Sequence, residues 1–339
     1  MTAASASPDR EALSAYGRET IAKGSKSFAL ASLLFGREMQ ADAQMLYAWC
    51  RWCDDVVDGQ TLGGDAPDAA MTREERAERL GALRRDTARA LSGESVGEPA
   101  FDAFGEVARR HQLPRRYCFD LLDGFAMDAE ATKFRSLDDT LRYCYGVAGV
   151  VGVMMAILMG VDRSDEETLD RACDLGLAFQ LTNICRDVLD DARADRIYIP
   201  ADILRAESVE PEPEAVLDPV QRENVWRAAV RVLDIADAYY ASASFGVRRL
   251  PLRAAAAVAA ARNVYSAIGG KIRAGGPAVW DQRVAVSGRR KAALALLGVA
   301  TSGPAAMFLR KSAAPPREGL WSRSAIRRGD EVIRPADCA

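Results

Sequence analysis

Histidine is nearly absent from this sequence: His111 is the single one among 339 residues. A catalytic triad built on histidine and a metal site made of several histidines are therefore excluded. Acid–base or metal chemistry in this chain must rest on carboxylates, arginines, amides and phenols.

The sequence also lacks the cysteine pattern of a disulfide-stapled protein. It contains seven cysteines, an odd and scattered set that favours a reducing compartment. Cys50 and Cys53 form one CxxC pair. A zinc site would need further thiolates or imidazoles near this pair, and the sequence offers no second pair. We therefore interpret both as buried cysteines of a helix.

Long apolar runs and a large charge excess are missing as well. No stretch of eighteen apolar residues is free of charge, and the first residues lack the basic and apolar regions of a signal peptide. The formal net charge of −3 does not favour binding to nucleic acid. We expect a cytoplasmic protein that has no spanning helix and no nucleic-acid partner.

Strand signals are scarce, whereas helix formers are plentiful and apolar residues recur at intervals of three and four. Hydrophobic residues make up 49% of the chain and charged residues 27%, as in an ordinary folded protein. The pattern predicts an all-α protein, a single-domain helical bundle. The main helices are expected at residues 39–58, 72–91, 114–130, 137–160, 165–190, 217–246, 250–273 and 284–300.

The C-terminal part differs in composition from the rest. Residues 283–311 carry six basic residues and no acidic one. This segment is expected either to lie on a membrane surface or to pack as a terminal helix with a solvated basic edge. We expect one helical domain over residues 1–311 and a loosely ordered tail over residues 312–339, which are rich in proline, arginine and serine.

A first stripe of polar residues lies where burial is expected, in MLYAWCRWCDDVVDG (45–59). Tyr47, Arg51, Asp54 and Asp58 follow one another at helical spacing, so they share one face over roughly 16 Å. Their neighbours are mostly apolar. Two carboxylates in such a wall repel each other and lose hydration unless a cation compensates them.

A second stripe lies in GLAFQLTNICRDVLDDARADRIYIP (176–200). Gln180, Asn183, Asp187 and Asp191 share a helix face, again between apolar residues. Each aspartate pair alone could be a solvated helix edge, but two pairs with aligned polar partners favour a site. Oxygen ligands without imidazole or thiolate indicate Mg²⁺ or Mn²⁺. A diphosphate would fit between the pairs, with Arg51 or Arg186 balancing its charge.

At these residues the chain resembles the squalene/phytoene synthase family. The two stripes are similar to its aspartate-rich motifs, KGSKSFALASLLF (23–35) to its N-terminal segment and YCYGVAGVVGVMM (143–155) to its central one. The resemblance spans about residues 15–285 and is closest to bacterial phytoene synthases. It implies an isoprenoid-synthase-type helical bundle around a central cavity.

The resemblance also implies roles for individual residues. The four aspartates, with Asn183, would hold Mg²⁺ or Mn²⁺ on the substrate diphosphates, and Gln180 would lie near the reacting carbons. The apolar residues Val147 and Val151, together with Phe28 and Phe179, would set the depth of the prenyl tunnel. The remaining residues expected around the diphosphates are Lys26, Ser27, Tyr47, Arg51, Tyr143, Arg186, Tyr198 and Tyr265.

The implied reaction joins two geranylgeranyl diphosphates head to head, through a cyclopropyl diphosphate, to phytoene. It is the first committed step of carotenoid biosynthesis, and no NADPH is expected. The product implies contact with a membrane surface, and a downstream desaturase is a possible partner. Three alternatives stay open: a squalene- or dehydrosqualene-type synthase acting on farnesyl diphosphate, another DDxxD prenyltransferase or terpene cyclase, and a scaffold protein without activity.

Overall fold

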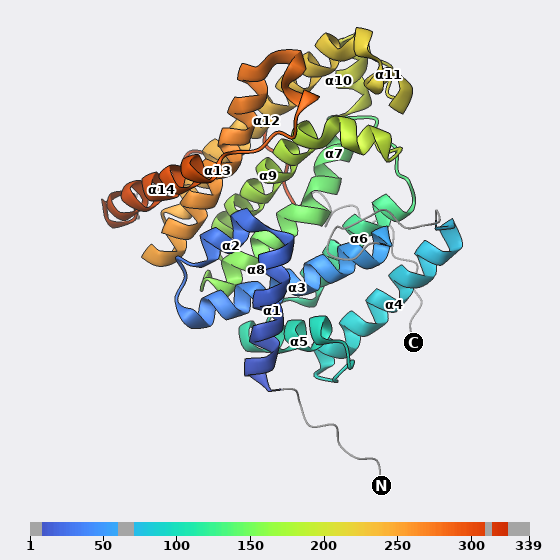
Figure 1. Ribbon diagram of the computed structural model, residues 1–339. Coiled ribbons are helices and arrows are strands. Elements are labelled where there is room, and N and C mark those ends of the chain that lie inside the picture. The colour runs from blue at the N-terminus through green and yellow to red at the C-terminus, as the bar shows by residue number, and fades with distance from the viewer. Residues whose placement is uncertain (1–8, 60–70, 309–313, 325–339) are drawn as a thin grey trace.

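The protein is built from helices packed in two groups (Figure 1). The computed structural model describes residues 9–59, 71–308 and 314–324, without the side chains of residues 26–27 and 302–308. Within these ranges all regular elements are helical. The α-helices are α1 (Arg10–Gly24), α2 (Lys26–Ser32), α3 (Arg37–Asp58), α4 (Arg73–Ser92), α5 (Pro99–His111), α6 (Arg115–Ala129), α7 (Leu137–Cys144), α8 (Val150–Leu158), α9 (Glu166–Arg193), α10 (Ala201–Ala206), α11 (Pro213–Leu217), α12 (Arg222–Val247), α13 (Leu252–Gly275) and α14 (Gly288–Phe308).

The all-α prediction is confirmed, and each of the eight predicted helices has a counterpart. Three helices of seven residues or more, α1, α2 and α5, were not predicted. Helix α5 begins with Pro99 at its first position, where the missing N–H costs nothing. The sequence analysis treated this proline as part of a break. Helix α14 starts at Gly288, later than predicted, because Val284 and Val286 are buried in an extended segment before it.

Helices α3 and α9 are the centres of the two groups. Helix α3 packs against α1, α5 and α6, whereas α9 packs against α8, α12 and α13. In Figure 1 the helices α1, α3, α4 and α5 occupy the lower half and α9 to α13 the upper half. Helix α9 is capped by Asp165, whose side chain accepts a hydrogen bond from the Thr168 amide at 3.1 Å. The two aspartate motifs therefore lie on the central helix of each group.

The segment between α7 and α8 approaches its neighbours backbone to backbone. Residues Tyr145–Gly149 form a π-helical turn. A Cβ atom added to Gly146 would lie 2.5 Å from the Gly124 Cα of α6, and one added to Gly176 of α9 would collide with the Ala148 carbonyl. Side chains larger than glycine would push these helices apart. The glycines therefore let the π-helical turn lie close to α6 and α9.

One continuous helical stretch among the described residues, Leu137–Leu158, is long and apolar enough to cross a membrane by length and composition. Of its most apolar window, 72% is buried inside the protein. This burial is the property of a core helix, and its apolar composition is explained by packing.

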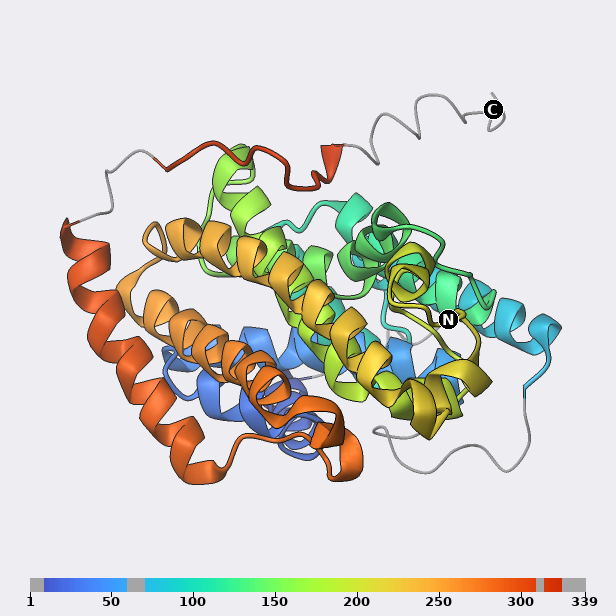
Figure 2. The same ribbon diagram turned by 90° about the horizontal axis from the view of Figure 1, so that it is seen from above.

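The segment 314–324 differs from the expectation of a loosely ordered tail beginning at residue 312. Trp321 and Arg323 are only 8% and 3% exposed, and the segment forms ion pairs with α9. Figure 2 shows it in red along one edge of the molecule. It is held because α9 offers it a row of carboxylates, of which Asp174 is fully buried, a feature that the composition of the tail could not reveal. Residues 325–339 lie outside the described part.

Candidate active site

A cavity of about 350 Å³ lies between α2, α3, α8, α9, α12 and α13. Most of its lining is apolar, and this lining includes the predicted tunnel residues Phe28, Val147, Val151 and Phe179. Tyr47, Gln180, Asn183 and Tyr265 line the same cavity and add polar groups to its wall. One space is therefore bounded by apolar side chains and by residues of both polar stripes.

Asn183 has an oxygen that no described group satisfies. Its Nδ2 atom donates a hydrogen bond to the Gln180 Oε1 atom at 3.4 Å, while its Oδ1 atom is buried and has no hydrogen-bond partner among the described residues. A buried amide oxygen in this state is costly unless a ligand compensates it. The atom is therefore suited to bind a cation that enters the site.

The first aspartate pair is held by two arginines. Arg51 contacts Asp54 at 2.9 Å and Asp55 at 2.6 Å along α3. Asp58 pairs at 2.6 Å with Arg196, which lies in the loop after α9. The pKa of Asp54 is raised to about 7, mainly because the carboxyl is removed from water, and the nearby Asp58 adds to the rise whereas Arg51 opposes it.

The second pair lies on α9. Arg186 binds its neighbour Asp187 through two hydrogen bonds, one of them 2.7 Å from Nε to Oδ1. The pKa of Asp191 is raised to about 8, first by burial and then by repulsion from Asp187, while Arg196 lowers it. Both aspartate pairs thus contain one carboxyl that resists ionisation near neutral pH.

Asp128, at the end of α6, was missed by the sequence analysis. It accepts hydrogen bonds from the hydroxyl groups of Tyr143 at 3.0 Å and Tyr198 at 2.7 Å. The two tyrosine rings are stacked at 4.8 Å. Burial raises the pKa of Asp128 to about 6, against the lowering effect of these hydrogen bonds. Its charge also raises the pKa of Asp54 and of Asp191, so Asp128 is coupled electrostatically to both pairs.

Arg196 was also missed, although it belongs to the quoted second motif. The motif comparison drew attention to its aspartates and to Tyr198, and nothing in the local spacing indicates that Arg196 reaches Asp58 on another helix. The signal for Asp128 is weaker, because a single aspartate near the end of a predicted helix is usually a surface residue. Both contacts depend on the tertiary fold.

The tyrosines of the site come from several helices. The Tyr47 hydroxyl lies directly over Gly24, the last residue of α1, and any larger residue at Gly24 would displace it. Burial raises the pKa of Tyr47 to about 12. The Tyr265 ring stacks on Phe179 at 4.2 Å. Burial raises the pKa of Tyr265, and the nearby Arg186 offsets only part of this rise. Lys26 and Ser27 begin α2 near Gly24, but their side chains lie outside the description.

The site carries an excess of negative charge. The described carboxyls gathered here are six, Asp54, Asp55, Asp58, Asp128, Asp187 and Asp191, and they face three arginines, Arg51, Arg186 and Arg196, so full ionisation would leave a charge of −3. No three acidic, histidine or cysteine groups in the described ranges form a ready cluster for a metal ion. Cations would therefore need oxygens from a substrate as well, as Mg²⁺ commonly does.

Comparison with known proteins agrees with this architecture. The squalene/phytoene synthase family model matches residues 21–290. A 15-cis-phytoene synthase of Pantoea ananas is 50% identical over 306 residues, which are 90% of this chain and 96% of that protein. A phytoene synthase of Pseudescherichia vulneris is 47% identical over 91% of this chain and 97% of its own.

Solved structures show the same fold. A dehydrosqualene synthase in complex with ligand is similar with a TM-score of 0.73 and 25% identity, covering 86% of this chain and 97% of that one. The squalene synthase HpnC of Alicyclobacillus acidocaldarius has a TM-score of 0.67 over 78% of this chain and 95% of its own. The chain therefore belongs to the squalene/phytoene synthase family.

Proposed function

We propose that this protein joins two geranylgeranyl diphosphates head to head to form phytoene. In the first half, one diphosphate leaves, the allylic cation is attacked by the double bond of the second molecule, and a proton is lost to give a cyclopropyl diphosphate. In the second half, the other diphosphate leaves, the skeleton rearranges, and a second proton is lost. Electrons balance without a reductant, so NADPH is not required.

The observation that carries this proposal is the union of an apolar cavity with an acidic site. The cavity suits prenyl chains, and the six carboxyls suit cations that bind diphosphates. The names of relatives about 50% identical over most of the chain support the same activity. The buried residues around the site would keep water away from the carbocations.

The donor set fits Mg²⁺ or Mn²⁺. Asp54, Asp58, Asp187 and Asp191 would hold the ions together with the unpartnered Oδ1 atom of Asn183. Such ions, when bound, stabilise the negative charge of a departing diphosphate. Burial raises the pKa of Asp54 and of Asp191, and a bound cation would offset this cost of ionising them.

The remaining polar residues would orient the substrates. Arg51 and Arg186 would offer charge to the diphosphates while they keep the neighbouring aspartates in place. Tyr47 and Tyr265, both on the cavity wall, would line the phosphate end, with Gln180 beside the reacting carbons. Tyr143 and Tyr198 act through Asp128, because both hydroxyl groups donate to its carboxylate.

The second candidate is a dehydrosqualene-type synthase that acts on farnesyl diphosphate, which the similarity to a solved dehydrosqualene synthase favours. Incubation with labelled geranylgeranyl or farnesyl diphosphate and Mg²⁺, with and without NADPH, decides between the candidates. We expect a forty-carbon hydrocarbon from the longer substrate and no effect of NADPH. A thirty-carbon product formed in preference, or a product richer by two hydrogens with NADPH, would contradict the proposal.

We further propose that the product leaves into a bilayer that the protein touches reversibly, because a forty-carbon hydrocarbon cannot enter water. Helix α14 carries exposed Leu296 and Leu297, at 70% and 53% exposure, and Leu33, directly after α2, is 66% exposed. Helices α2 and α13, which also line the cavity, pack against each other, and α14 packs on α13. The basic residues at the start of α14 would add attraction to anionic lipid. A downstream desaturase that accepts the product there is a possible partner.

Flotation with anionic liposomes tests this contact. Replacing Arg289, Arg290 and Lys291 with glutamine should weaken binding at low salt, since each basic residue contributes about 1 kcal/mol near an anionic surface. High salt should weaken the binding of the unmodified protein to the liposomes in the same way. If the triple variant binds as well as the unmodified protein and with the same salt dependence, the basic segment is not the contact.

A further inference from the structure

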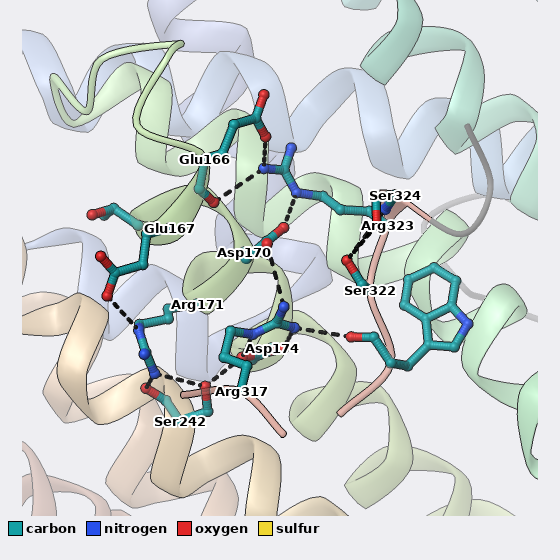
Figure 3. Close-up of polar contacts among 12 residues, drawn as sticks. Glu166, Glu167, Asp170, Arg171, Asp174, Ser242, Arg317, Ser322, Arg323 and Ser324 are labelled. Carbon is teal, nitrogen blue, oxygen red and sulfur yellow. Dashed lines mark hydrogen bonds and ion pairs between the residues drawn. The ribbon is translucent and has the colours of Figure 1, made fainter. Parts of the chain in front are cut away.

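The segment 314–324, which we call the C-terminal strap, lies across the first half of α9. Three carboxylates, Glu166, Asp170 and Asp174, follow one another every four residues along α9 and face the strap (Figure 3). Arg317 binds Asp174 through two hydrogen bonds of 2.8 and 2.6 Å. Asp174 is fully buried, so its charge depends on this partner and on the Ser242 hydroxyl.

A second arginine fixes the far part of the strap. The Arg323 Nε atom donates to Asp170 at 2.5 Å, and its Nη1 atom donates to the Tyr117 hydroxyl at 2.8 Å. Trp321, which lies between Arg317 and Arg323 in the sequence, is buried, and its Nε1 atom donates a hydrogen bond to Asp138 at 3.1 Å. The strap is thus bound by charge-assisted hydrogen bonds and by an aromatic anchor, the features of a specific contact.

The strap also holds a residue that borders the cavity. Arg171 is 3% exposed and lines the same cavity as Asn183. Its Nη2 atom donates to the Pro315 carbonyl at 2.7 Å, and its Nη1 atom donates to the Ser242 hydroxyl at 3.1 Å. A Cβ atom on Gly246 of α12 would lie 2.8 Å from the Arg171 Cβ atom, so this side chain fills the gap between the two helices.

Arg171 lies at the end of the cavity that is distant from the aspartates. Twelve residues of α9 separate it from Asn183, which corresponds to about 18 Å along the helix. An extended geranylgeranyl chain is about 19 Å long, from fifteen carbon–carbon bonds. The methionines Met155 and Met159 line the cavity together with Arg171. A prenyl chain with its diphosphate at the aspartates would therefore end at Arg171.

We infer that the C-terminal strap closes the far end of the prenyl cavity by fixing Arg171, and that this wall sets the longest chain the enzyme accepts. The inference rests on the proposed function, because it names the limit of that substrate class. Arg171 and Arg317 are specificity-determining and positioning residues here, and neither is expected to touch the diphosphate.

The test compares geranylgeranyl diphosphate with the twenty-five-carbon geranylfarnesyl diphosphate. Arg171→Ala removes the wall, so the ratio of kcat/KM for the longer over the shorter substrate should rise about tenfold or more, as pocket contacts of one or two methylenes allow. Arg317→Ala, which alters no cavity residue, should raise the ratio in the same direction. Arg317→Lys keeps the charge and should restore part of the discrimination.

Arg84→Ala is the matched control, since Arg84 pairs with Asp123 between α4 and α6, away from the strap. It should leave the ratio unchanged. A variant that is only less stable would lose activity on both substrates by the same factor, so the ratio of kcat/KM would stay constant. An unchanged ratio in folded Arg171→Ala, or in both Arg317 variants, would overturn the inference.

A binding measurement separates this inference from the proposed function. The unmodified protein should bind the uncharged alcohol geranylgeraniol more tightly than the longer geranylfarnesol. Arg171→Ala should reduce or reverse this difference in affinity. If the unmodified protein binds geranylgeraniol but forms no hydrocarbon, the proposed function fails while the wall is still supported by the alcohols. If it turns over geranylgeranyl diphosphate but the alcohols bind alike in both proteins, the wall is wrong.

Discussion

Helix α9 carries two rows of carboxylates with the same spacing, and the protein treats them in opposite ways. The first row, Glu166, Asp170 and Asp174, is paired with arginines of the strap. In the second row, Asp187 is paired with Arg186, whereas Asp191 keeps a pKa of about 8. Burial raises the pKa of Asp174 too, but the hydrogen bonds from Arg317 oppose it.

The difference teaches that spacing alone does not distinguish a structural row from a cation site. Each row runs along a face of α9, and both rows are partly buried. What differs is the supply of positive charge: the fold brings arginines to the first row and leaves the second with an excess of carboxyls. A row without enough partners is a candidate for a cation and a substrate.

The largest effect is expected from breaking the second row of α9 or the aspartate pair of α3. Asp54→Ala, Asp58→Ala, Asp187→Ala and Asp191→Ala should each reduce turnover about a thousandfold or more, because stabilisation of a leaving diphosphate by a bound cation contributes several kcal/mol. Initial rates with geranylgeranyl diphosphate at saturating Mg²⁺ measure this loss.

These variants should remain folded, since removing one of several repelling carboxyls relieves repulsion. The variants at Asp54 and Asp191 are the easiest to interpret. Replacing Asp58 or Asp187 also leaves an arginine, Arg196 or Arg186, without its ion-pair partner. Helical circular dichroism and urea unfolding provide the control. Near-normal rates in any two of the four variants would contradict the cation assignment.

Breaking the first row should act on stability. Asp174→Ala removes a fully buried carboxylate and leaves Arg317 unpaired, which should lower the free energy of unfolding by about 3–5 kcal/mol. Glu19→Ala, which breaks the exposed pair with Lys23, should change the free energy of unfolding far less, because water screens this pair. Urea unfolding measures both. Equal costs for the two variants would show that the strap contact is not a buried pair.

The carboxyls of the candidate site should also respond to pH. Because the pKa of Asp54 is about 7 and that of Asp191 about 8, both above the ordinary value, these carboxyls hold protons below those values and must release them to bind a cation. The affinity for Mn²⁺ should therefore rise from pH 6 to pH 8, by up to about tenfold per pH unit for each proton released, and level off above.

Calorimetric titration with Mn²⁺ across this range tests the expectation. In metal-free protein the sign is reversed for stability: the folded state favours the protonated carboxyls, so stability should fall as pH rises from about 4 towards 8. An Mn²⁺ affinity that does not depend on pH would show that Asp54 and Asp191 are not ligands.

A small effect is expected from Asp128, which links the two aspartate pairs. Tyr198→Phe removes a hydrogen bond that lowers the pKa of Asp128, so this pKa should rise above about 6. Asp128 would then stay neutral up to a higher pH and would raise the pKa of Asp54 and Asp191 less, so the pH of half-maximal Mn²⁺ binding should move downward by less than one unit. Tyr240→Phe, which loses a buried hydrogen bond to Thr182 instead, should leave this pH unchanged.

Much of the fold follows from the sequence because helical periodicity is a local property. The helices around both motifs were placed within a few residues, and the four tunnel residues line the cavity. Helix α5 was missed because Pro99 reads as a break and yet starts the helix. Local signals report where an element can begin, and tertiary packing decides whether it does.

The site was predicted only as far as its motifs extend. Tyr47, Gln180, Asn183 and Tyr265 do meet in one cavity, although their separate roles stay predictions. Asp128 and Arg171 were missed because each owes its importance to partners distant in sequence: Tyr198 for Asp128, and Pro315 for Arg171. No periodicity within a single helix contains that information.

The position of the strap late in the chain affects how the protein matures on the ribosome. Synthesis is vectorial, and domains begin to fold before their last residues emerge. Helix α9 is complete long before Arg317 and Arg323 are made, so a nascent chain must carry the buried Asp174 without its arginine. If the strap closes the cavity as inferred, the end wall forms only after residues 314–324 have emerged, and a chain interrupted just short of residue 314 would contain both aspartate motifs without that wall.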